Sequence, residues 1–304
     1  MQSAVHNALL HAEKWLGKGS LPDFIPELTQ VDPDRLSISL MDEQGRIYSA
    51  GHTQDRFTIQ SISKVLAFAF ICETEGMEKV LSLVDVEPCG DRFNSIYRLE
   101  LMEKRPFNPF LNAGAIALFS RLPGRNLEEK YQNFRTFAIR LLGNPQLEYS
   151  HSTCDCEMAT GHRNRALASM LLDNGITCGD PEEHLMLYYR GCAFLANTEE
   201  LSRLGAILAF DGINPTSGER LLSPSVCAAL RAMMAGCGLY NSTGKYNIEA
   251  GIPAKSGSSG AIMAAARNRC GLGVFSPRLD GNGNSICGIK ALSFLSDELN
   301  LRVL

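Results

Sequence analysis

The sequence lacks the features that mark several large classes of protein. None of its 304 residues belongs to an apolar stretch long enough to span a bilayer, and the amino-terminal residues 1–7 lack the charged-then-apolar pattern of a secretion signal. The net charge of -4 is mild, and no block of basic residues is present. We therefore predict a soluble, cytoplasmic protein with neither a nucleic-acid nor a membrane partner.

Motifs for nucleotides, metals and a hydrolase nucleophile elbow are also missing. The chain has no G-x-G-x-x-G and no G-x-S-x-G, and the segment from Gly238 to Lys245 has one residue too many for a P-loop. Ten cysteines are present without a C-x-x-C pair, and Cys72, Cys192, Cys227 and Cys270 lie in apolar surroundings. The nearest metal-like group is His151, Cys154, Cys156 and His162. Its spacing matches no standard zinc pattern, so we predict free thiols and no metal site; the family resemblance described below implies that no cofactor is needed either.

What the sequence does contain is a serine and a lysine three residues apart, at the start of an apolar run. Ser61 and Lys64 lie on one face of a helix if the helix begins near Ser61, as the extended segment before it and residues 65–71 after it indicate. A lysine held in apolar surroundings loses its proton more readily and can accept one from the serine. The alternative is that Ser61 caps the helix and Lys64 is solvated. A second S-x-x-K, Ser242 to Lys245, has a turn-like composition and no apolar helix after it, so we expect it not to be catalytic.

Enzymes with a Ser-Lys nucleophile also carry a late Lys-[ST]-Gly on a strand, and this chain has one. Lys255-Ser256-Gly257 stands in the required order. The backbone N–H of Ser258, together with that of Ser61, could then form an oxyanion hole for the carbonyl under attack.

The remaining pattern predicts an α/β fold. We expect a helix over residues 3–17, a hairpin of strands at 36–40 and 46–50 with the first strand half-buried, a mostly helical region from 65 to 235, strands at 261–266 and 271–275, and a terminal helix to about 300. Within the helical region, residues 163–172 and 199–210 are clearly amphipathic. The two ends of the chain would thus supply one sheet, in a single domain with a sheet part at about 20–64 and 245–304 and a helical lobe at about 65–244. Ser61 would lie at the cleft between the two parts.

With these motifs the chain resembles a known family, the serine-dependent glutaminases of bacteria and mitochondria. The resemblance runs through nearly the whole sequence, and order, spacing and length agree. The matching segments are 57–65, 87–90, 93–95, 108–116, 157, 161–164, 188, 192, 222–224, 237–240, 253–257, 276–277, 279–280 and 283–285. It implies a β-lactamase/transpeptidase-like fold, with an antiparallel sheet flanked by helices, and a homodimer or homotetramer.

The resemblance also implies residue roles. Ser61 would attack the side-chain amide of L-glutamine to form a γ-glutamyl ester, and Lys64 with the Tyr240 hydroxyl would relay protons. Backbone N–H groups of Ser61 and Ser258 would hold the oxyanion. The residues that would bind the amino-acid end of the substrate are Asn112, Glu157, Asn164 and Tyr188. Water would then release L-glutamate.

Without the resemblance, each of these residues has an ordinary structural explanation. Asn112 could cap a helix, and Glu157 and Asn164, seven apart, could form a solvated polar face. Tyr188 and Tyr240 could be packing residues.

Two positions depart from the family pattern. Phe24 stands where the family usually has a tyrosine near the substrate, and Ser258-Ser259-Gly260-Ala261 replaces a Val-Gly-Gly-Gly type sequence. We therefore keep two alternatives open: a penicillin-recognising acyl-serine hydrolase or esterase, and a catalytically weak glutamine-binding sensor. A nitrocefin or nitrophenyl-ester assay tests the first, and binding of glutamine without ammonia release would identify the second.

Overall fold

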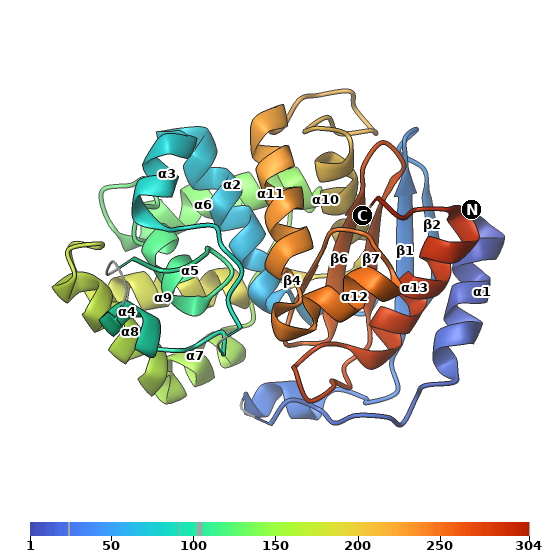
Figure 1. The fold of residues 1–304 in the computed structure, drawn as a ribbon, viewed down its shortest axis with the longest axis horizontal. Coiled ribbons are helices and arrows are strands. Elements are labelled where there is room, and N and C mark those ends of the chain that lie inside the picture. Colours follow the sequence, from blue (N-terminus) through green and yellow to red (C-terminus); the bar gives the residue numbers. More distant parts are fainter. Residues whose placement is uncertain (24, 91, 102–104, 304) are drawn as a thin grey trace.

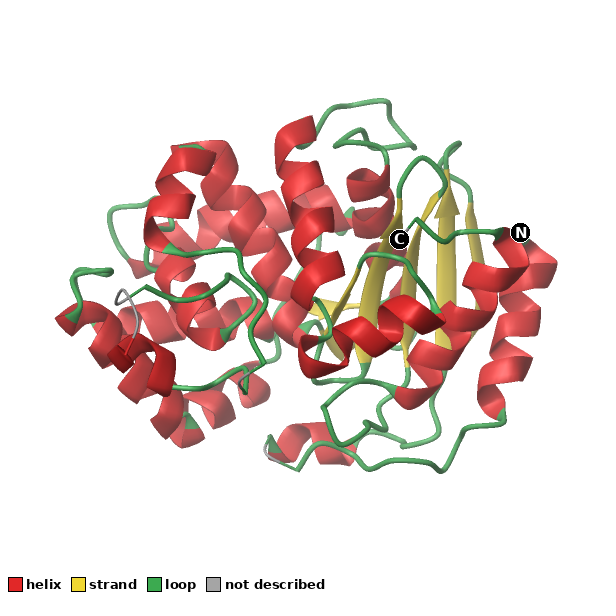
Figure 2. Ribbon diagram, viewed as in Figure 1, coloured by secondary structure: helices red, strands yellow, loops and turns green. Residues whose placement is uncertain are grey.

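An antiparallel sheet occupies one side of the molecule and a group of helices the other (Figures 1 and 2). The computed structural model describes residues 1–23, 25–90, 92–101 and 105–303. The five strands of the sheet lie in the order β2-β1-β7-β6-β5. Their bounds are β1 (Ser37–Asp42), β2 (Ile47–Gly51), β5 (Ala254–Ser256), β6 (Ala261–Ala266) and β7 (Cys270–Phe275). Because β1 pairs with β7, the two ends of the chain build one sheet, as the sequence predicted.

Helices cover both faces of this sheet. The first and last helices, α1 (Gln2–Glu13) and α13 (Ile286–Leu299), pack together against one face, and α10 (Thr198–Ala209) packs on the other. The strand β1 is therefore buried along its whole length, whereas its alternating sequence predicted a half-buried strand. Its polar residue Ser39 is satisfied internally, since its hydroxyl lies 2.8 Å from Thr198 Oγ1 and 3.0 Å from Ser49 Oγ.

The helix α10 lies directly on the backbone of the sheet. Its start is fixed by a capping box in which Asn197 and Glu200 satisfy each other's backbone N–H groups. Glycines then allow the close approach: a Cβ atom on Gly271 of β7 would overlap the backbone of Ala206, and one on Gly205 would overlap the Ala264 carbonyl. This helix belongs in sequence to the predicted helical lobe, yet it forms a layer of the sheet part.

Most of the other helices form the second part of the molecule. They are α2 (Ser63–Glu75), α3 (Met77–Leu83), α4 (Tyr97–Leu101), α5 (Asn112–Phe119), α6 (Leu127–Leu142), α7 (His151–Thr160), α8 (His162–Asp173), α9 (Pro181–Cys192) and α11 (Pro224–Cys237). The short helix α12 (Thr243–Glu249) instead lies beside α13, and its Tyr246 belongs to the core on that side of the sheet. The predicted helices at 163–172 and 199–210 correspond to α8 and α10. Short elements complete the chain: the 3-10 helices η1 (Pro26–Gln30), η2 (Gln60–Ile62) and η3 (Tyr240–Ser242), and the paired strands β3 (Phe57–Thr58) and β4 (Leu195–Ala196).

Two hydrophobic cores meet at the sheet. Alternate residues of β6 point to opposite sides, so that Met263 belongs to the core shared with the helices, while Ile262 belongs to the core under α1 and α13. The four cysteines predicted in apolar surroundings, Cys72, Cys192, Cys227 and Cys270, are buried free thiols.

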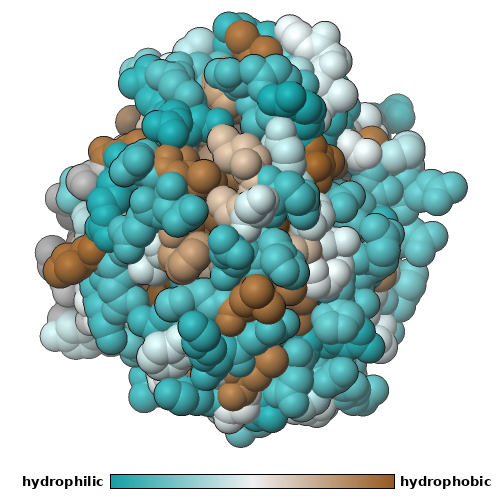
Figure 3. Space-filling view, turned by 90° about the vertical axis from the view of Figure 1, so that its right-hand side faces the viewer, coloured by the Kyte–Doolittle hydropathy of each residue, from teal (hydrophilic) through white to brown (hydrophobic). Residues whose placement is uncertain are grey.

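The outer surface on the α1 side is mostly hydrophilic, with separate hydrophobic patches (Figure 3). Exposed apolar side chains of the molecule include Leu10 on α1 and Ile47 on β2. No helix in the described part of the chain is long and apolar enough to cross a membrane.

Candidate active site

Ser61 lies just ahead of the helix that follows it, rather than on that helix. The strand β3 is held by β4 and by a bond from the Ile59 N–H to the Phe194 carbonyl (2.9 Å), and the chain then turns through η2 before α2 begins at Ser63. The turn places Gln60 at a φ of 48°, a left-handed conformation that is uncommon outside glycine. Ser61 is left partly exposed between two buried residues. Ser61 therefore lies in the 3-10 turn two residues ahead of α2, near the first helical turn as predicted.

Lys64 is completely buried, which excludes the solvated alternative. Its Nζ donates to the Phe110 carbonyl at 2.9 Å and to Asn112 Oδ1 at 2.7 Å, and both acceptors are neutral. Burial lowers the pKa of Lys64 to about 8, although the nearby Glu157 charge opposes part of the shift. About a tenth of this amine is thus free of its proton at pH 7, far more than for an ordinary lysine.

Burial raises the pKa of Tyr240 well above 10, and an interaction of its hydroxyl with the Ser61 side chain acts in the opposite direction. Its ring lies close to two lysines, with centroid distances of 5.8 Å to Lys64 Nζ and 4.3 Å to Lys255 Nζ. Among the hydrogen bonds of the described residues, none joins Ser61 directly to Lys64. The phenol is thus in contact with the serine and next to both amines.

Asn112 connects the lysine to the amide and phenol groups predicted to bind substrate. Besides Lys64, its Oδ1 accepts a bond from the Tyr188 hydroxyl at 3.2 Å, and its Nδ2 donates to Asn164 Oδ1 at 2.9 Å. Asn164 in turn donates to the Tyr189 hydroxyl at 2.8 Å. Asn112 is the first residue of α5 rather than its cap, and it is buried, so its side chain serves this network.

Glu157 reaches the same region from α7. Burial raises the pKa of its carboxyl to about 8, while a hydrogen bond from Gln60 and the charge of Lys64 act in the opposite direction. One carboxylate oxygen, Oε2, is buried without a hydrogen-bond partner. An acceptor of this kind suits a ligand that brings its own donor, such as an ammonium group.

The predicted Lys-Ser-Gly segment lies beside this cluster. Lys255 and Ser256 are on β5, and a Cβ atom on the next residue, Gly257, would come within 2.6 Å of the Ile59 carbonyl. The loop is thereby held against the turn that carries Ser61. Within the described part of the chain, no hydrogen bond uses the backbone N–H of Ser61 or Ser258, so both donors are available, as an oxyanion hole requires.

The second S-x-x-K has a different setting. It lies on η3 and the short helix α12, not in the turn that its composition predicted, because Thr243 bonds to the Tyr240 carbonyl at 2.7 Å and starts a helix. The Lys245 side chain is 83% exposed. It therefore lacks the burial that alters the pKa of Lys64.

Three residues of the cluster were not among the predicted site residues. Gln60 and Lys255 stand inside the two motifs but had no assigned role, and Tyr189 follows the predicted Tyr188. Burial, with the adjacent charge of Lys64, holds the pKa of Lys255 well below its usual value. Only the three-dimensional arrangement distinguishes these residues from their neighbours. The departure at Phe24 lies outside the described residues.

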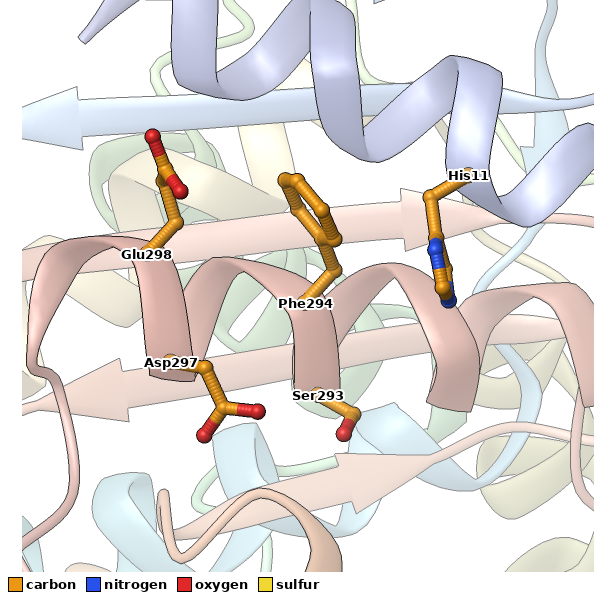
Figure 4. Close-up of a pocket in the computed structure, with 5 residues that line it drawn as sticks. All are labelled: His11, Ser293, Phe294, Asp297 and Glu298. Atoms are coloured by element: carbon orange, nitrogen blue, oxygen red, sulfur yellow. The ribbon is translucent and has the colours of Figure 1, made fainter.

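Neither of two surface cavities coincides with this cluster. One, of about 420 Å³, is a groove between α1 and α13, where the His11 and Phe294 rings stack and Asp297 and Glu298 point away from each other (Figure 4). The other, of about 200 Å³, lies between η1, β3 and the start of α7. Across the residues that the structure describes, no group of three or more His, Cys, Asp or Glu side chains is placed to hold a metal ion.

Comparisons with known proteins show the family of this chain. The Glutaminase family model matches residues 19–304. "Glutaminase 2" of Clostridium perfringens is 39% identical over 304 residues, covering 100% of both chains, and the glutaminase of Alkaliphilus oremlandii is 40% identical with the same coverage. A solved structure of Bacillus subtilis glutaminase, in covalent complex with 5-oxo-L-norleucine, superposes with a TM-score of 0.91 at 34% identity, covering 100% of this chain and 99% of that one. The fold shared with these neighbours is the β-lactamase-like α/β arrangement.

Proposed function

This chain belongs to the glutaminase family, and from that premise we propose that it hydrolyses L-glutamine to L-glutamate and ammonia with Ser61 as nucleophile. The observation that carries the proposal is the contact of the Ser61 hydroxyl with Tyr240, beside a buried lysine whose pKa is about 8. A serine hydroxyl becomes a useful nucleophile when a neighbouring base can take its proton as it attacks.

In the first half of the reaction, Ser61 Oγ bonds to the side-chain carbonyl carbon of glutamine. The serine proton passes through the Tyr240 hydroxyl toward Lys64, and the carbonyl oxygen becomes an oxyanion at the N–H groups of Ser61 and Ser258. When this intermediate collapses, the carbon–nitrogen bond breaks, the relay returns the proton to the departing nitrogen, and ammonia leaves. A γ-glutamyl ester on Ser61 remains.

In the second half, water replaces ammonia. The same relay accepts a proton from the water as its oxygen bonds to the ester carbon, and the Ser61 oxygen leaves with that proton. The products are L-glutamate and the free serine. No metal or organic cofactor enters either step.

The far end of the substrate would be held by the polar network. Glu157, with an unpartnered oxygen, suits the ammonium of a free amino acid, while Asn112, Asn164 and Tyr188 supply the donors that its carboxylate needs. A ligand would have to exchange its own bonds for some of those that these side chains make with one another. A site that binds both the ammonium and the carboxylate of its substrate selects a free amino acid over a peptide or a nitrophenyl ester.

The location and the oligomeric state of the protein are also part of the proposal. We place the protein in the cytoplasm as a single-domain homodimer or homotetramer, an expectation supported by the family resemblance. Sedimentation equilibrium of the purified chain tests the assembly, and a monomer at working concentration would contradict it.

The decisive experiment is ammonia and glutamate release by purified protein, comparing glutamine with asparagine and including Ser61→Ala. We expect release from glutamine, little from asparagine, and loss of turnover in the variant with glutamine binding retained. Turnover that survives Ser61→Ala would reject the nucleophile. Glutamine binding without any release would identify a sensor, and nitrocefin hydrolysis would identify a penicillin-recognising enzyme.

A further inference from the structure

The hydroxyl of Ser258 makes a contact that its proposed role as a backbone donor does not need. Ser258 Oγ donates to Gln60 Oε1 at 3.3 Å, joining the loop after β5 to the residue next to the nucleophile. Gln60 is only 3% exposed, so few other donors can reach its amide oxygen. Where the family pattern has valine at this position, no such donor exists.

The amide group of Gln60 serves three partners at once. Its Oε1 accepts from Ser258, and its Nε2 donates to Thr58 Oγ1 at 3.3 Å. It also acts on Glu157, whose pKa it lowers, and because an ionised carboxylate only accepts, the part of the amide that acts there is Nε2. Turning the amide over would point its oxygen at the carboxylate, so only one orientation suits Glu157.

From this geometry we infer that Ser258 is a positioning residue. Its hydroxyl donates to the buried side-chain carbonyl of Gln60 and so fixes the orientation of that amide. In this orientation the Gln60 N–H group supports Glu157, which would hold the substrate ammonium. The inference rests on the proposed function, since it assigns Ser258 to the recognition of free glutamine. It separates two roles of one residue, with the backbone N–H acting on the oxyanion and the side chain acting on the opposite end of the substrate.

The physical consequence follows from removing the hydroxyl alone. In Ser258→Val the backbone N–H remains, but Gln60 Oε1 is left buried without a donor, which is a costly state. The amide then moves to find another donor, and Glu157 loses part of its support. A hydrogen bond donated to a carboxylate favours the charged form, so its loss raises the pKa of Glu157.

Other groups also act on Glu157, and the pH effect must be measured against them. They are Glu27 on η1, Lys64 on α2, Cys154 and Cys156 on α7, and Tyr188, Tyr189 and Cys192 on α9. None of them is changed by a substitution at Ser258. A shift that appears in Ser258→Val is therefore due to Gln60.

The test compares Ser258→Val and Ser258→Thr with the native protein in glutamine hydrolysis. We expect Ser258→Val to raise the KM about fivefold, the value of one hydrogen bond, with kcat within about twofold, and to move the acid limb of kcat/KM to higher pH. Ser258→Thr keeps a hydroxyl and should restore both. Ser259→Ala is the matched control, because the neighbouring Ser259 hydroxyl is buried without a partner.

The opposite outcomes are equally clear. An unchanged KM and pH profile in Ser258→Val, or a fall in kcat at constant KM, would overturn the inference, as would equal effects in Ser258→Val and Ser258→Thr. If the native protein does not release ammonia, the proposed function fails, but the role of Ser258 can still be tested by glutamine binding. Calorimetry with L-glutamine in the Ser61→Ala background should then show weaker binding when Ser258→Val is added, and unchanged affinity would reject the inference.

Discussion

Replacing Tyr240 by phenylalanine tests the proton relay with little disturbance of the fold. The ring is held by packing that does not need the hydroxyl: its centroid lies 5.5 Å from that of Phe93 and 4.3 Å from Lys255 Nζ. Only the hydrogen bond with Ser61 is lost, which costs about 1 kcal/mol of stability. The variant should therefore fold normally.

The effect on catalysis should be much larger than the effect on stability. A positioned proton-transfer group contributes about 10²-fold to 10⁴-fold to a rate, and kcat of Tyr240→Phe should fall by a factor in this range. The KM should change little, because the network that would bind the amino-acid end of the substrate runs through Asn112 rather than Tyr240. Steady-state ammonia release, with thermal unfolding measured in parallel, gives both quantities.

The chain supplies a matched control in Tyr246. This tyrosine is 2% exposed, and its hydroxyl is buried without a partner. Tyr246→Phe should leave kcat unchanged and stabilise the protein, since an unsatisfied buried hydroxyl costs about 1 to 3 kcal/mol. If Tyr240→Phe keeps more than half of the native kcat, the phenol is not in the relay, and Lys64 must take the proton from Ser61 directly.

Two further predictions follow from burial and packing. Burial lowers the pKa of Lys64 to about 8 and raises that of Glu157 to about 8, so the neutral amine and the carboxylate that we propose as working forms appear only as pH rises. We therefore expect kcat/KM to decrease below about pH 8. A flat pH profile down to about pH 6 would contradict this. A Cβ atom on Gly238 would overlap the Ala254 carbonyl of β5. Gly238→Ala should therefore destabilise the protein by about 2 kcal/mol and reduce activity by displacing Lys255 and Ser258. The control is Gly244→Ala on α12, where the added Cβ meets open space and should raise the melting temperature slightly. Equal melting temperatures for the two alanine variants would refute the packing argument.

The sheet of the fold was predictable because local pattern and burial agree there. The hairpin of β1 and β2, the strands β6 and β7 and the terminal helix α13 lie close to where apolar periodicity and turn residues indicated. The pattern could not show that α10 covers the second face of the sheet, because that contact depends on glycines far apart in sequence, Gly205 and Gly271. The burial of β1 on both faces followed from the same contact.

For the site, the sequence named the candidate residues but not their contacts. The S-x-x-K spacing singled out Ser61 and Lys64, yet their separation on an ideal helix predicted a direct pairing. The left-handed turn at Gln60 places Ser61 ahead of α2, and the side chain that interacts with Ser61 is Tyr240. The role inferred for Ser258 depends on a 3.3 Å contact across 198 residues of sequence, which no spacing argument could supply.

The two buried lysines of this site reduce the free energy of unfolding. Lys64 and Lys255 are both fully buried, and their hydrogen-bond acceptors are neutral: the Phe110 carbonyl, Asn112 Oδ1 and the Ser256 carbonyl. A lysine kept for stability would be paired with a carboxylate or would extend its amine to water, because an isolated buried ammonium is costly. Here folding instead depresses both pKa values, so the lysines oppose folding at neutral pH and do so less as pH rises through the lowered pKa values. Two such groups beside one tyrosine suit the proton transfer that we propose, and the surrounding apolar packing offsets the stability that they cost.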